Sequence, residues 1–337
     1  MYIPTTYGEA VLFCLITMAC WGSWATVARL INDNWRFELF YWDYVTGILF
    51  ATILLGFTWG THEGAGRSFV ADLAQTTLPN FLTALSAGVL LNIGNILLTT
   101  AIEWTGAQRA LPLAMGVALI SGVTLNYIRA PLGHPALLFF GVIFIGFAVW
   151  LDAQAYARSH RFLFRAPFDG IVASAISGIL LGLFYHLIAA ATARNFMQPT
   201  IGKMGPYASV FTFALGAFLS SFLFIPNLME RPIAGAPPVT ASDYFNESLR
   251  NHLVGILGGS VWGIGLEFSI LAAERIGFAI SFGLAQGALL VSAIWSIFFW
   301  DDYRNAPQGT HTLLLMMVIA YILGLISFVL ARVYAFD

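Results

Sequence analysis

Apolar stretches of about 20 residues, long enough for a membrane-spanning helix, alternate with short polar breaks along the whole chain. A helix of about 20 apolar residues crosses the roughly 30 Å hydrocarbon core of a bilayer. The pattern therefore predicts an all-α polytopic membrane protein of ten transmembrane helices. The predicted spans are residues 7–31, 40–60, 79–102, 107–128, 135–157, 168–193, 206–226, 250–273, 277–300 and 311–335.

The polar breaks carry loop residues and are too short to hold a folded domain. More of the 15 Lys and Arg residues follow odd-numbered spans than even-numbered ones, so the positive-inside rule places both termini outside the cell. The main breaks are Asn32–Asn34, Thr61–Asp72, Pro131–His134, Arg158–Pro167 and Glu230–Leu249.

An internal repeat relates the two halves of the chain at an offset of 171 residues. Spans three and four then resemble spans eight and nine, and five helices fall in each half, residues 1–160 and 161–337. An odd number of crossings reverses the second half, which predicts inverted repeats with a solute site between them near the midplane. The matched pairs include Gly88 with Gly259, Gly94 with Gly265, Glu103 with Glu274, Gly106 with Gly277, and Gly116 with Gly287.

Composition agrees with a membrane protein. Hydrophobic residues make up 59% of the chain, charged residues only 9%, and the mean hydropathy is +0.80. A soluble domain carries about a quarter charged residues. The first apolar run lacks a basic start and an Ala-x-Ala exit, so it is interpreted as a span rather than a signal peptide. We expect a multi-pass protein of a bacterial inner membrane.

Several classes of function find no support in the sequence. The net charge of −2 and the scattered basic residues do not favour nucleic acid as a partner. Cys14 and Cys20 lie in one apolar segment and do not resemble a disulfide framework or a metal site. Metalloprotease, serine hydrolase and phosphate-binding-loop motifs are absent from the sequence. We therefore expect a transporter without a cofactor, not an enzyme, whose partners are a small solute, protons and the lipid bilayer.

Glu267 is the strongest candidate for proton coupling. It lies deep in span eight and is the only carboxylate that the predicted boundaries place well inside a span. Acids at such depth usually face a cavity or a partner, and low dielectric favours their protonated form. The alternative is a structural acid that is hydrogen-bonded to a neighbouring helix. Asp43, at the predicted start of span two, is expected to stabilise a helix N-terminus.

Amide side chains supply the first candidates for binding solute. Asn92 and Asn95 are three residues apart in span three and share a helix face. Gln286 in span nine corresponds to Met115 of span four in the repeat, and both are candidates for binding solute. Amides bind polar solutes, but they also join transmembrane helices to one another.

Aromatic side chains and one histidine complete the candidate set. Trp21 and Trp24 in span one could stack on a sugar or a flat ring, with lipid-facing packing as the alternative. Tyr185 is a further candidate for binding solute. His186 is a second candidate for carrying protons, although a lone histidine in a span is more often a packed residue.

Several segments resemble known transporter families. Gly-Ser-Val-Trp-Gly-Ile-Gly-Leu-Glu-Phe (259–268), Ile-Gly-Phe-Ala-Ile-Ser-Phe-Gly-Leu-Ala-Gln (276–286) and Gly-Ala-Gln-Arg-Ala-Leu-Pro-Leu (106–113) look like the glucose/ribose porter family of the drug/metabolite transporter superfamily. Trp-Gly-Ser-Trp (21–24) and Tyr-Trp-Asp-Tyr (41–44) are similar to the related ureide permeases and rhamnose transporters.

This resemblance implies ten helices, a central cavity lined by spans one, three, four, six, eight and nine, and uptake coupled to protons. Asn95 matches an asparagine of the ureide permeases and Gln286 a glutamine of both groups, whereas Glu267 stands where the ureide permeases have glutamine. We expect proton-coupled uptake of a small neutral polar solute, with a sugar as the first candidate. A ureide or nucleobase-like heterocycle, or export of metabolites or drugs, are the alternatives.

Overall fold

The computed structural model describes residues 1–28, 30, 35–62, 64, 66–159, 167–300 and 302–336. The predicted loop at Asn32–Asn34 and the predicted boundary between the halves at residues 160 and 161 lie outside this described part.

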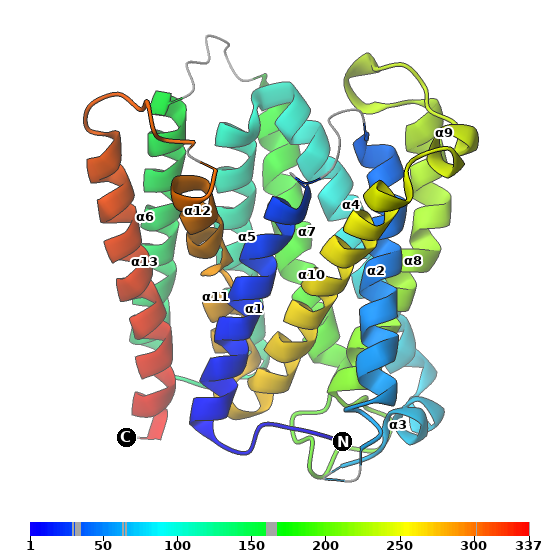
Figure 1. Cartoon of the computed structure of the whole chain (residues 1–337). Helices are drawn as coiled ribbons and strands as arrows, with labels where there is room; N and C mark the ends of the chain where they lie inside the picture. The colour runs from blue at the N-terminus through cyan, green and yellow to red at the C-terminus, as the bar shows by residue number, and fades with distance from the viewer. Residues whose placement is uncertain are drawn as a thin grey trace.

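The described chain is a bundle of long α-helices, joined by short connections (Figure 1). The helices are α1 (Tyr7–Ala28), α2 (Phe37–Phe57), α3 (Phe69–Gln75), α4 (Leu78–Thr105), α5 (Ala107–Arg129), α6 (Pro135–Ser159), α7 (Phe168–Ala191), α8 (Pro206–Glu230), α9 (Ala241–Phe245), α10 (Leu249–Ile276), α11 (Phe278–Ala285), α12 (Ala288–Phe298) and α13 (Thr310–Val333). Short 3-10 turns cover Ile233–Gly235 and Tyr334–Phe336.

Nine helices within the described residues are long and apolar enough to cross a membrane. They are α2, α4, α5, α6, α7, α8, α10, α13 and the combined segment of α11 and α12. The prediction of an all-helical, multi-pass protein is confirmed. The remaining predicted span, residues 7–31, corresponds to α1, which packs along α10 and α12 in the same bundle but is not among the nine.

The structure departs from the predicted elements in two ways. The predicted loop Thr61–Asp72 contains the first part of the short helix α3, and the predicted loop Glu230–Leu249 contains the whole of the short helix α9. A capping box starts α9, because Thr240 accepts from the Asp243 N–H and the Asp243 carboxylate accepts from the Thr240 N–H. In addition, the predicted continuous span 277–300 is divided into α11 and α12.

The outer surface of the bundle is apolar. On α6, Phe139, Phe140, Ile143, Phe147 and Trp150 are all exposed. So large an apolar face would be unfavourable in water and is accounted for by contact with lipid.

Both chain termini lie at one end of the bundle, together with α3, and α9 lies at the opposite end (Figure 1). We call these the termini end and the α9 end. Helices α1, α4, α6, α8, α11 and α12 run toward the α9 end, and α2, α5, α7, α10 and α13 run back (Figure 1).

Candidate functional site

A cavity of about 770 Å³ lies among α1, α2, α4, α5, α7, α10, α11 and α12. Its lining includes Trp35 and Phe37 at the start of α2 and Ile102 near the end of α4, so it reaches the α9 end. The volume falls in the usual range for small-molecule sites. We call it the central cavity.

Aromatic rings form the walls and floor of the central cavity. Trp21 and Trp262 stack at the floor, with ring centroids 5.4 Å apart and planes 9° apart. The Trp21 indole N–H donates to the Trp262 carbonyl oxygen at 3.1 Å, which fixes the pair. Phe184 and Phe213 pack on Trp262. The rings therefore provide flat surfaces and close the cavity toward the termini end.

Asn95 supplies one polar group of the central cavity. Its Nδ2 donates to the Tyr41 hydroxyl at 3.0 Å, and that hydroxyl donates to Asn92 Oδ1 at 2.9 Å. Because the bond to Tyr41 uses one of the two N–H groups, the carboxamide oxygen and the second N–H of Asn95 are the groups available to a solute. Thr99, one turn further along α4, also lines the cavity.

Gln286 supplies the second carboxamide, at the break between α11 and α12. The Gln286 and Gly287 N–H groups bond to Gly283 and Leu284, three residues back instead of four, which tightens the turn and separates the two helices. The Gln286 side chain lines the cavity and makes no hydrogen bond within the described part of the chain. Broken helices at membrane depth commonly form solute sites in transporters.

The other predicted solute-binding residues divide into two groups. Trp21, Trp24 and Met115 line the central cavity, whereas Asn92 and Tyr185 do not. Asn92 Nδ2 donates to the Ala217 carbonyl oxygen and to the Ser220 and Ser221 hydroxyls at 2.7, 2.8 and 3.0 Å, so its side chain joins α4 to α8. The Tyr185 hydroxyl is buried and shares a 2.8 Å hydrogen bond with the Ser269 hydroxyl. These two residues hold helices together.

Glu267 lies beyond the floor of the central cavity. It is on α10, more than one turn past Trp262 toward the termini end, and is 1% exposed. Neither carboxylate oxygen has a hydrogen-bond partner among the described residues, and the side chain does not line the cavity. His186 on α7 does not line it either, and its Nδ1 is buried without a partner in the described chain.

Two further acids lie inside long helices. The helix α2 begins at Phe37, so Asp43 is inside the helix rather than at its N-terminus, and it is 2% exposed. Its carboxylate accepts from the Tyr244 hydroxyl at 2.6 Å and is 2.9 Å from His252 Nδ1, which holds α9 against the bundle. Asp152 lies two turns inside α6, so the expectation that Glu267 is the only acid well inside a span was wrong.

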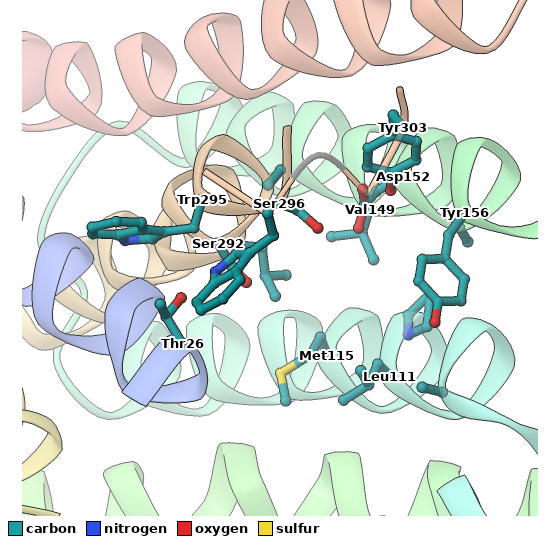
Figure 2. Close-up of a pocket in the computed structure, with 16 residues that line it drawn as sticks. Thr26, Leu111, Met115, Val149, Asp152, Tyr156, Ser292, Trp295, Ser296 and Tyr303 are labelled. Carbon is teal, nitrogen blue, oxygen red and sulfur yellow. The ribbon is translucent and has the colours of Figure 1, made fainter. Parts of the chain in front are cut away.

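Asp152 lines a second cavity of about 290 Å³ between α5, α6 and α12 (Figure 2). The predicted span ended at residue 157, five residues after Asp152. The longer helix, which ends at Ser159, puts it deeper. We call this space the side cavity.

The termini end is closed by a network between two loops. Arg67 donates to Asp72 at 2.8 Å and to the carbonyl oxygens of Pro199 and Lys203 at 2.9 and 2.7 Å. The Gly205 N–H also donates to Asp72. Burial raises the pKa of Asp72, and the hydrogen bonds from Arg67 and Gly205 oppose that rise.

A multi-pass bundle with a central cavity of solute size that reaches one end of the bundle is typical of a membrane transporter. Comparison with known proteins identifies the family. The sequence profile described as "Ureide permease" matches residues 40–161 and 145–331. The chain belongs to the ureide permease family.

Individual relatives agree with this assignment. The chain is 23% identical to ureide permease 4 of Arabidopsis thaliana, over 96% of each chain. It is 22% identical to a Streptococcus pyogenes protein named "Putative sugar uptake protein", over 89% of this chain and 92% of that one. A solved crystal structure has the same fold, with a TM-score of 0.64 and 14% identity over 96% of this chain and 98% of that one. The expected resemblance to ureide permeases and sugar porters is confirmed.

Proposed function

We propose that this protein is a secondary active transporter that takes up a small neutral polar solute together with protons. One observation carries the proposal: the central cavity has neutral side chains at every described lining position, with two carboxamides facing aromatic walls. A charged solute would lose its hydration there without gaining a charged partner. A neutral solute can stack on the rings and pair with the amides of Asn95 and Gln286.

A ureide is the solute class that this lining fits best. Ureides are flat and rich in N–H and C=O groups, which match the carboxamides of Asn95 and Gln286 and the plane of the Trp21–Trp262 pair. Sugars are the second candidate, because tryptophan rings also pack on sugar faces and one relative is named for sugar uptake. A nucleobase-like heterocycle shares the chemistry of the ureide.

We further propose that α1 is a tenth span and that the chain is two inverted five-helix repeats. The helices α4 and α10 support this, because both have 28 residues and start 171 positions apart, at Leu78 and Leu249. The neighbouring contacts also correspond. Ser177 on α7 donates to the Gly94 carbonyl oxygen at 2.8 Å, and Thr17 on α1 donates to that of Gly265 at 2.9 Å.

In alternating access, the central cavity would open first to one end of the bundle and then to the other. The central cavity reaches the α9 end, and the Arg67–Asp72 network holds the termini end closed. If both termini are outside a bacterial inner membrane, as the positive-inside rule predicts, this conformation faces the cytoplasm. Release of the Arg67 contacts would open the other face.

Proton coupling through Glu267 extends the proposal, with His186 as the second candidate. An acid with two unpartnered oxygens and 1% exposure favours its neutral form, because the buried anion would lack compensation. A change in accessibility during transport would then change its protonation. Glu267→Gln keeps the shape and fixes the neutral form.

Transport into proteoliposomes tests the function. Radiolabelled allantoin, as a ureide, and radiolabelled glucose and ribose are offered to purified protein with and without an inward proton gradient. We expect gradient-dependent accumulation of at least one of them, with allantoin first. Accumulation in inverted rather than right-side-out cell vesicles would instead identify an exporter. No transport of any of the three would reject the proposed solute class.

A further inference from the structure

The side cavity is separate from the central cavity but touches it. Leu111, Met115 and Leu289 line both cavities, so these side chains stand between them. At about 30 Å³ for each water in the liquid, 290 Å³ is ample for several water molecules. The side cavity also lies toward the α9 end, because it is lined by residues near the start of α5 and the end of α6.

Asp152 is the charged side chain of this cavity among its described lining residues. Its carboxylate makes no hydrogen bond and no ion pair within the described residues. Figure 2 shows it directed toward the cavity beside Tyr303. An acid inside a membrane span is costly to keep charged and is usually functional. Asp152 therefore requires either water, a bound cation or a proton.

A proton satisfies these surroundings better than a metal ion does. Hard cations require several oxygen ligands at once. The cavity is lined largely by aromatic and aliphatic side chains, including Trp295, Val149 and Leu289, and its Ser296 hydroxyl already donates to Asp302. A proton needs only the carboxylate itself and a path of water.

The helix α12 links this acid to the solute site. Its first turn follows the break at Gln286, and Leu289 of that turn lines both cavities. Ser292 and Ser296, further along α12, also line the side cavity (Figure 2). Charged Asp152 needs the cavity hydrated, whereas neutral Asp152 allows α12 to pack against α6. A movement of α12 would therefore change both sites together.

We propose that Asp152 in the side cavity binds and releases a proton during transport. This inference rests on the proposed function for its role in coupling, but proton binding itself can be measured without a solute. The Asp152 carboxylate forms an O–H bond with a proton from water at the α9 end and returns it to water in the alternate conformation. Neutralisation by the proton favours closure of α12 over α6, and loss of the proton reverses it.

Other ionisable groups lie near Asp152 and influence its binding of a proton. Tyr156 is on the same helix, Tyr303 follows α12, and Tyr321 of α13 is close enough to interact electrostatically with Asp152. Arg158, in the last turn of α6, lies close to Gly309, and the Asp302 carboxylate accepts a hydrogen bond from the Ser296 hydroxyl. The matched control is Asp169→Asn, which removes an exposed carboxylate at the start of α7, also at the α9 end.

Infrared titration of the reconstituted protein tests proton binding. A carboxylic acid C=O band that disappears with rising pH is expected in the wild type and in Asp169→Asn, and the Asp152 contribution should be absent in Asp152→Asn. The position of the band should shift, not vanish, in Asp152→Glu. Identical titrations in the wild type and Asp152→Asn would overturn the proposal.

Transport of radiolabelled allantoin tests the coupling role. In Asp152→Asn we expect exchange without a gradient to stay within about twofold of the wild type and proton-driven accumulation to fall at least about tenfold, because only the driven process needs the charge change. Asp152→Glu should restore driven accumulation. Driven accumulation unchanged in Asp152→Asn, or a wild type driven by a sodium gradient at constant pH, contradicts the inference. A wild type that transports no solute counts against the proposed function, while the infrared titration still decides whether Asp152 binds a proton.

Discussion

Gly106 and Gly277, which stand 171 positions apart, adopt the same backbone conformation. Their φ and ψ angles are 81° and 147° at Gly106 and 89° and 146° at Gly277. Each ends a 28-residue helix and begins the next one, and a positive φ of this size favours glycine over other residues. The agreement is the sharpest structural support for the proposed inverted repeat.

The glycines at the helix crossings should be equivalent in the two halves. A Cβ at Gly88 would overlap the carbonyl oxygen of Phe213 on α8, and one at Gly259 would overlap that of Tyr44 on α2. We expect Gly88→Ala and Gly259→Ala each to destabilise the protein by about 1–3 kcal/mol, because the helix backbones must separate. Thermal unfolding in detergent measures the effect.

Gly146→Ala is the control for this prediction. A Cβ there meets no atom within 4 Å, so the change should be neutral or slightly stabilising through helix propensity. If the two crossing variants unfold at the same temperature as Gly146→Ala, the close packing of α4 on α8 and of α10 on α2 is not needed for stability.

Substitutions of Asn92 and Asn95 should have different effects on stability and on solute affinity, although both residues are on α4. Asn92→Leu removes the amide hydrogen bonds to α8 and leaves the buried Tyr41 hydroxyl without its acceptor, which should cost about 1–3 kcal/mol of stability. Asn95→Leu removes one hydrogen bond to Tyr41, so it should lower stability less than Asn92→Leu does, and it should weaken solute affinity about tenfold, as expected for one lost hydrogen bond in a buried site. The reverse pattern would place the solute next to Asn92 instead.

The network at the termini end should depend on pH through Asp72. Burial raises the pKa of Asp72 above its ordinary value of 3.8 in this closed conformation, and an opened loop would return it toward that value. Asp72 therefore binds its proton more tightly in the closed form than in the opened form. Closure is favoured below the ordinary pKa, and this contribution is lost as the pH rises through the raised pKa.

Electron spin resonance distances between labels at His62 and Gln198 would measure this opening. Both residues are exposed and lie on the two loops that Arg67 joins. The population with separated loops should grow with rising pH in the wild type and stay constant in Asp72→Asn, which does not titrate. A growth with rising pH that persists in Asp72→Asn would assign the effect to another group.

Hydropathy predicted the helix positions well because the bilayer imposes a length on each span. The predicted span 107–128 and the observed α5, Ala107–Arg129, differ by one residue. The break at Gln286 was not predicted, since Gly283–Ala288 is apolar apart from one amide and its division depends on local hydrogen bonding. The thickness of the bilayer constrains the length of each span, but it does not determine whether the helix in that span is continuous.

The candidate site was harder to predict than the fold. Asn92 and Asn95 share a predicted face, yet one contacts α8 and the other the central cavity, because the neighbouring helix decides what each side chain meets. Glu267 was found by its depth in span eight, but its position beyond the Trp262 floor depends on how α1 packs against α10. The side cavity around Asp152 is lined by residues of α5, α6 and α12, so no single segment of the sequence could predict it.

Uptake of radiolabelled allantoin by proteoliposomes containing the wild type and the Asn95→Leu/Gln286→Leu double variant tests the central claim most directly. The double variant keeps the bundle and its apolar volume but removes both carboxamides from the central cavity. We predict saturable uptake by the wild type and loss of affinity by about a hundredfold in the double variant, because two independent buried hydrogen bonds of about 1.4 kcal/mol each are lost. Saturable uptake with equal affinity in both proteins would contradict the account, since solute would then not bind in the central cavity.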